Sequence, residues 1–166
     1  MPSSSGSRAI FPVLSGRPVG PSSYELLYRS GAGLTPRPLR RIASGGELSR
    51  VMLASKVVLG NADGVDTLVF DEVDAGVGGS TARALAGVLA DLASTHQVIV
   101  VTHLAQVAVM ADKHYVVSKE PGDVPQTHLD EVTGEARTAE IARMLSGDQS
   151  EASLAHAKQM LEEARG

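Results

Sequence analysis

Two adjacent carboxylates stand at the end of a short apolar run in this 166-residue chain. The run is TLVF at 67–70, and Asp71 and Glu72 follow it directly. Such a run predicts a buried strand that delivers both acids at its carboxyl end. One carboxylate can hold Mg²⁺ through water while the next orients or deprotonates an attacking water, which suits phosphoryl transfer. Taken alone, such a pair is more often simply the polar end of a strand.

A glycine-opened helix forms a second candidate site. Apolar residues at helical spacing predict a helix from about Glu47 to Leu59, preceded by Ser44, Gly45 and Gly46. The unpaired N–H groups at such a helix start can bind a phosphate, and glycine lets the phosphate approach the backbone closely. Ser44 also stands three residues before Glu47, as in a capping box, so simple capping explains the pattern as well.

A histidine follows the next apolar run, VIVV at 98–101, two residues after its end. A helix is expected between the two runs, from about Ser80 to Ala93, with five small or apolar residues on one face: Ala82, Leu85, Ala86, Leu89 and Leu92. A strand, helix and strand in this order predict a right-handed crossover between parallel strands. Their carboxyl ends then face one crevice, so we expect Asp71, Glu72 and His103 to converge there. A lone histidine at a strand end can also be structural.

The remaining elements are shorter. Two stretches, 10–14 and 24–28, could pair as antiparallel strands around a turn-rich loop, and 30–38 reads as irregular backbone because it is rich in Gly and Pro. Beyond the histidine we expect a short helix at 106–110, edge strands at 114–118 and 127–132, and a helical tail interrupted at Gly147-Asp148. The tail's apolar patches are Ile141, Met144 and Leu145, and then Leu154, Ala157, Met160 and Leu161.

Composition narrows the classes of function. At 166 residues there is room for one domain or one lobe of a larger one, and no apolar run approaches the ~20 residues of a membrane span. The absence of cysteine excludes disulfides and thiolate metal sites, which fits a reducing cytoplasm. A net charge of −4 and 3% aromatic residues argue against a global nucleic-acid surface or a base-stacking platform. Four arginines, Arg37, Arg40, Arg41 and Arg50, are interpreted as a solvated face.

The order of these segments resembles that of ABC-type ATPases. IASGGELSR at 42–50 is similar to their signature motif, TLVFDEVD at 67–74 to the Walker B strand and D-loop, and VTH at 101–103 to the switch-histidine strand. ASGGELSR, DEVDAGVGG, VTHLAQVA and ARMLSGD together are similar to the C-terminal head of the RecN family, SMC-like ATPases of bacterial DNA double-strand break repair. The resemblance extends over about 10–165. Transporter heads typically carry Gln and Pro where this chain has Glu47 and Val73.

The resemblance implies an α/β fold, the C-terminal lobe of a P-loop NTPase head of the ABC/SMC type, with parallel strands, flanking helices and short antiparallel edge strands. It implies ATP and Mg²⁺ as ligands, Asp71 as the residue that helps hold Mg²⁺, Glu72 as the base for water and His103 as the sensor of the γ-phosphate. Ser44 and Gly46 would contact ATP bound to a partner head, and Asp74 would lie at that dimer seam. The full set of implied nucleotide-binding residues is Ser44, Gly45, Gly46, Glu47 and Asp74.

One part of the family pattern is missing. No Gly is followed by Lys anywhere, so the loop that cradles the phosphates is absent, and so is any heptad run for a coiled-coil arm. We therefore expect residues 1–9 to be a disordered lead or truncation scar and 10–166 to be the C-terminal lobe. Its expected partners are an N-terminal lobe carrying the Walker A loop, a second head, and DNA through the full-length protein. A cytoplasmic, nucleoid-associated bacterial location follows from the same resemblance, and no membrane is involved.

Two alternatives stay open at the level of sequence. The chain could be a non-catalytic module in which the signature helix and D-loop only dimerise or dock on a complete head. It could also be a stand-alone enzyme that uses Asp71 and Glu72 as a different acid pair, although this requires a phosphate anchor that the sequence does not offer.

Overall fold

The computed structural model describes residues 25–29, 31–41, 44–60, 64–120 and 126–164. The lead at 1–9, the expected strand at 10–14 and the first residues of the signature motif, 42–43, lie outside the described residues. The elements in chain order are β1 (Leu27–Tyr28), β2 (Arg37–Pro38), a 3-10 turn (Leu39–Arg41), α1 (Gly45–Leu59), β3 (Thr67–Phe70), α2 (Gly79–Ala93), β4 (Gln97–Val100), α3 (Ala105–Ala108), β5 (Tyr115–Glu120), β6 (Gln126–Glu131), α4 (Gly134–Ser146) and α5 (Glu151–Glu163).

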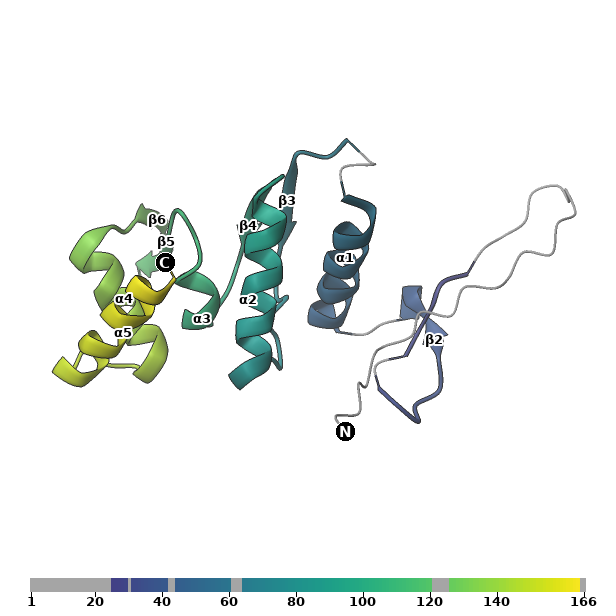
Figure 1. The fold of residues 1–166 in the computed structure, drawn as a ribbon, viewed down its shortest axis with the longest axis horizontal. Helices are drawn as coiled ribbons and strands as arrows, with labels where there is room; N and C mark the ends of the chain where they lie inside the picture. Colours follow the sequence, from purple (N-terminus) through teal and green to yellow (C-terminus); the bar gives the residue numbers. More distant parts are fainter. Residues whose placement is uncertain (1–24, 30, 42–43, 61–63, 121–125, 165–166) are drawn as a thin grey trace, which may run out of the picture.

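The two apolar runs form one parallel pair, as expected. β3 and β4 run in register, with Phe70 opposite Val100, and the N–H of Val101 donates to the carbonyl oxygen of Phe70 at 2.9 Å. α2 is the crossover between them (Figure 1). Because the strands are parallel neighbours, the residues that follow each strand lie at the same edge of the pair.

Two clusters of buried side chains hold the molecule together. In the first, α2 packs on β3 and β4, and its buried residues are the five expected ones, Ala82, Leu85, Ala86, Leu89 and Leu92. Four of the five, all but Ala82, form that cluster together with Leu68 and Phe70 of β3, Leu53 of α1, Val73 and Val107. Burying a side chain of this size contributes roughly 1.5–3 kcal/mol, so the amphipathic pattern of α2 determines which face meets the strands.

The second cluster joins the C-terminal helices to α3. Ile141 and Ala142 of α4 and Ala157 and Leu161 of α5 bury against Ala105, Ala108 and Val109. Arg137 of α4 donates from Nη2 to the carbonyl oxygens of Ala108, Val109 and Ala111, at 3.2, 3.2 and 2.6 Å. The carbonyl oxygen of Ala108 also accepts from the N–H of Ala111, and those of Val109 and Ala111 lie beyond the last helical donors, so one side chain caps α3 and joins it to α4.

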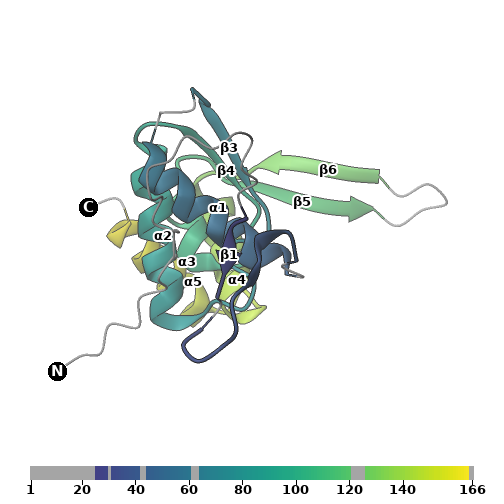
Figure 2. The ribbon, with the colours of Figure 1, turned by 90° about the vertical axis from the view of Figure 1, so that its right-hand side faces the viewer.

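The remaining strands form two antiparallel pairs. β5 and β6 make the expected ribbon, shifted by one or two residues at each end, and Figure 2 shows it extending away from the helices. β1 pairs with β2, Leu27 opposite Pro38, so the expectation of irregular backbone throughout 30–38 is wrong at Arg37–Pro38. A proline at a short edge strand is tolerated because its missing N–H need not serve the ladder.

One face of the β3–β4 pair has no cover within the described part of the chain. Val69, Ile99 and Val101 alternate with the inward residues and are 66%, 47% and 57% exposed. Val69 lies opposite Ile99 in the register. A groove beside them, between α1 and β3, is lined in part by Leu48 and Met52, which are also exposed. The apolar residues that predict α1 therefore stay largely uncovered. Among the described helices, none is long and apolar enough to cross a membrane.

Candidate functional site

The start of α1 is capped as the sequence indicates. Ser44 has extended backbone, and its Oγ accepts a hydrogen bond from the N–H of Glu47 at 3.4 Å. Ser44 and Gly45 are exposed, whereas Gly46 is buried. The exposed end of a capped helix leaves backbone donors available to an anion.

The two glycines allow α1 to pack closely on the loop after β3. A Cβ added to Gly46 would lie 2.7 Å from both the Cβ of Ala75 and the carbonyl oxygen of Glu72. One added to Gly45 would lie 2.5 Å from Oε2 of Glu72. Neither position accommodates a side chain without a shift, so the glycines serve a contact within the chain itself.

Two side chains of α1 fasten the same loop. Arg50 donates from Nη1 to the carbonyl oxygens of Val73 and Ala75, at 3.2 and 2.8 Å, and Ser49 Oγ donates to the carbonyl oxygen of Asp71 at 2.6 Å. Arg50 is half-buried, so the interpretation of all four arginines as a solvated face is wrong for this one. The start of α1 and the acid-bearing loop therefore form one hydrogen-bonded unit.

Glu72 has an unusual backbone. Its φ is 54°, and it is the one described residue other than glycine with a positive φ. This conformation costs a non-glycine residue roughly 1–2 kcal/mol and is concentrated at functional sites. The turn is closed by the N–H of Ala75, which donates to the carbonyl oxygen of Glu72 at 2.9 Å. The side chains of Asp71 and Glu72 are both exposed.

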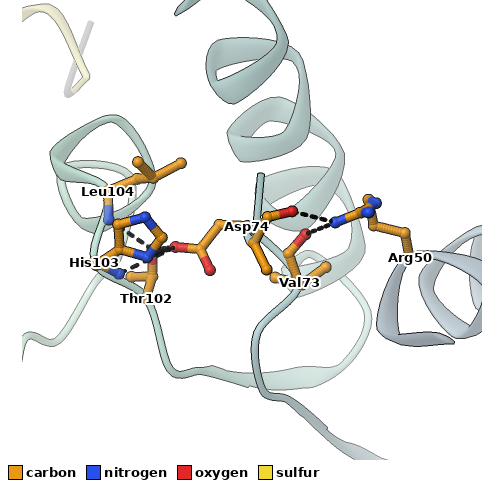
Figure 3. A network of polar contacts seen from close by, with 7 residues as sticks. Arg50, Val73, Asp74, Thr102, His103 and Leu104 are labelled. Carbon is orange, nitrogen blue, oxygen red and sulfur yellow. Dashed lines mark hydrogen bonds and ion pairs between the residues drawn. The ribbon is translucent and has the colours of Figure 1, made fainter. Parts of the chain in front are cut away.

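The third acid, Asp74, points the other way and is only 2% exposed. Its Oδ2 accepts from the hydroxyl of Thr102 and from the N–H of His103, the latter at 3.0 Å, and lies 3.1 Å from Nδ1 of His103 (Figure 3). Thr102 Oγ1 in turn accepts from the N–H of Leu104 at 3.0 Å. The polar residues after β4 are thereby tied to the loop after β3.

The expected site residues are thus brought to one edge, with different contacts from those the sequence suggested. The polar contact of His103 is with Asp74, and Glu72 lies instead against Gly45 at the start of α1. Sequence reasoning missed Thr102, Ser49 and Arg50. Thr102 directly precedes the histidine, which is the one signal that could have identified it.

No group of three or more His, Asp or Glu is placed to hold a metal ion among residues whose positions the structure gives. Mg²⁺ does not need such a group, because it keeps several waters and takes one or two carboxylates together with substrate phosphates. The exposed carboxylate of Asp71 at the end of β3 fits that mode of binding.

Comparison with known proteins identifies the relatives. DNA repair protein RecN of Treponema pallidum is 52% identical over 146 residues, which cover 87% of this chain and 26% of that protein. RecN of Deinococcus radiodurans is 52% identical over 143 residues, 86% of this chain and 25% of that protein. RecN of Streptomyces coelicolor is 49% identical over 150 residues, which cover 89% of this chain and 26% of that protein. The chain belongs to the RecN family, whose C-terminal portion it matches.

The chain spans about a quarter of the length of these RecN relatives. No protein-family model matches it. A solved structure from work on ATP-driven dimerisation and DNA-stimulated activation of SMC ATPases has a TM-score of 0.50 and is 21% identical. The match covers 98% of this chain and 82% of that one, and it supports the fold of an SMC-type head lobe.

Proposed function

We propose that this chain supplies the signature segment, the acid pair and the switch histidine to a composite ATP-hydrolysing site in a RecN-like head that acts in DNA repair. The observation that carries the proposal is the packing of the glycine-opened start of α1 on the loop that holds Glu72, at the edge where β4 delivers His103. The three segments of the resemblance are thus in contact through the loop after β3, which supports their acting together.

Each residue has a distinct role in this proposal. Asp71 would hold Mg²⁺ through water, and the ion, when bound, would neutralise charge on the phosphates. Glu72 would orient and deprotonate the attacking water, which its exposed side chain allows. Ser44 and Gly45, both exposed, would offer the helix start to the γ-phosphate of a nucleotide held by a second head. His103 would contact the same phosphate from its own side.

The uncovered apolar surface supports a partner that completes the head. Val69, Ile99 and Val101 on the strands and Leu48 and Met52 across the groove form one exposed patch, and soluble chains rarely leave such patches open. We assign the patch to the part of RecN proteins that this chain does not span, including the Walker A loop. Head dimerisation, DNA contact and a location at the bacterial nucleoid would belong to the completed protein.

Reconstitution tests the proposal. The 166-residue chain and the remaining portion of a RecN protein, produced together, should bind and hydrolyse ATP, whereas the chain alone should not turn over ATP. Glu72→Gln should abolish turnover while nucleotide binding, measured with a fluorescent ATP analogue, is retained. Val69→Lys with Ile99→Lys should prevent assembly, and Val88→Lys, at an exposed position of α2 outside the patch, serves as the control.

Two results would refute it. ATPase activity in the purified chain alone would show that no second part is needed. An assembled head in which Glu72→Gln turns over ATP at the wild-type rate, while changes around Arg50 disrupt assembly, would identify a non-catalytic docking module. The RecN and SMC relatives do not favour that alternative.

A further inference from the structure

We propose that Asp74 is a positioning residue that holds His103 in one tautomer, with the proton on Nδ1 and Nε2 left as the nitrogen that meets the ligand. Oδ2 of Asp74 lies 3.1 Å from Nδ1 of His103. A carboxylate oxygen accepts hydrogen bonds and repels a ring lone pair, so its position 3.1 Å away favours an N–H at Nδ1. Nε2 then lies on the opposite side of the ring, and the side chain of His103 is 69% exposed.

The carboxylate is itself held in place. It is 2% exposed, and its Oδ2 also accepts from the backbone N–H of His103 and from the hydroxyl of Thr102. The backbone of Asp74 is fixed by its carbonyl oxygen, which accepts from the N–H of Val77 at 3.0 Å. A buried carboxylate needs such donors because an unsatisfied one is costly. Asp74 is therefore a fixed acceptor and His103 is the exposed group that it orients.

This role differs from a place at the seam between heads, since it is performed within a single chain. The buried carboxylate orients an imidazole that itself contacts the ligand, as partners of metal-binding and catalytic histidines do in other sites. That Nε2 meets a nucleotide phosphate or water rests on the proposed function. The tautomer of His103 does not, so the two can fail independently.

Long-range proton–nitrogen NMR correlations of the ¹⁵N-labelled 166-residue chain test the tautomer directly. The chain has five histidines, and the ring pattern that disappears in His103→Gln is assigned to His103. Under conditions where the ring is neutral, wild type is expected to show Nδ1–H at His103. Asp74→Ala should shift the ring toward Nε2–H. Asp74→Asn should restore Nδ1–H, because its amide oxygen can still accept a hydrogen bond. Thr102→Val removes a different donor to Oδ2 and should leave the tautomer unchanged.

Two outcomes overturn the proposal: Nε2–H at His103 in wild type, or an unchanged tautomer in a folded Asp74→Ala chain. Should Asp74→Ala fail to fold, the wild-type spectrum decides alone. In the assembled head Asp74→Ala is expected to lower kcat about ten- to a hundredfold, with Asp74→Asn nearer to wild type. An inactive wild-type assembly would refute the proposed function while leaving the tautomer assignment intact.

Discussion

Arg50 bridges the carbonyl oxygens of Val73 and Ala75 with a single guanidinium nitrogen, at 3.2 and 2.8 Å. Hydrogen bonds from a charged donor contribute roughly 1.5–3 kcal/mol, and the two carbonyls would lose their donor in Arg50→Met. We expect this variant to lower the free energy of unfolding by about 1–3 kcal/mol, measured by urea denaturation. Arg83→Met, which removes an exposed arginine from α2, is the matched control and should change little. Equal midpoints for the two variants would contradict the bridge.

The two glycines at the start of α1 should respond differently to alanine. In Gly46→Ala the new Cβ meets the Cβ of Ala75 and the backbone oxygen of Glu72, both at 2.7 Å, and the backbone cannot move aside freely. Overpacking of this kind typically costs 1–3 kcal/mol, partly offset by the better helix propensity of alanine. In Gly45→Ala the neighbour is the flexible end of the Glu72 side chain, which can rotate.

Thermal denaturation of both variants checks this pair. Gly46→Ala should melt several degrees below wild type, and Gly45→Ala should melt at or above it. The reverse order would mean that α1 does not pack on the loop as described.

Glu72 should show a trade between stability and activity. Because its φ of 54° is unfavourable for a side-chain-bearing residue, Glu72→Gly should raise the free energy of unfolding by about 0.5–1 kcal/mol. Glu72→Gln keeps the unfavourable backbone and should match wild type in stability. Chemical denaturation separates the two, and both should be inactive in an assembled head. A Glu72→Gly chain less stable than Glu72→Gln would argue against strain at this position.

Asp148 provides a pH dependence. Hydrogen bonds lower the pKa of its carboxyl from 3.8 to about 2. The largest effect comes from the Ser153 hydroxyl, followed by the Ser150 N–H and then by the Ser146 and Ser150 hydroxyls. The lowered pKa means that the folded state favours the charged form. The stabilisation is therefore complete above the unfolded pKa near 4 and is lost as pH falls toward 2.

Carbon NMR of the Asp148 carboxyl should give a midpoint near pH 2, and Asp148→Asn should flatten the pH dependence of melting between pH 4 and 2. The carboxyl is fully exposed, so the effect on stability should be small and salt-sensitive. A midpoint near 4 would show that the serines do not bind it.

Much of the fold could be predicted because it depends on local pattern. The buried face of α2 and the parallel pairing of β3 with β4 follow from spacing and from the crossover rule, and both are confirmed. Strand ends differ by one or two residues, since adjacent residues at an end have similar propensities. The β1–β2 pair was missed because only two residues of each strand pair, which leaves no periodicity to detect.

The contacts of the site were harder to predict for a different reason. Asp71, Glu72 and Asp74 are the same kind of residue in one short segment, yet two are exposed and one is buried. Their directions depend on the turn that the N–H of Ala75 closes at Glu72 and on donors in the segment after β4, about thirty residues later in the chain. Likewise the helical spacing of Arg50 in the sequence does not distinguish it from an exposed arginine. Its acceptors are carbonyl oxygens of the loop after β3, which is distant in the sequence.

The β5–β6 ribbon has a kinetic consequence. Nearly all of its residues are exposed on both faces, and isolated two-stranded ribbons are marginally stable in water. Its amide hydrogens should exchange with deuterium by local opening within the chain, long before those of α2, whose protection requires global unfolding. A protease that cleaves the ribbon should therefore do so while the rest of the chain keeps its native structure.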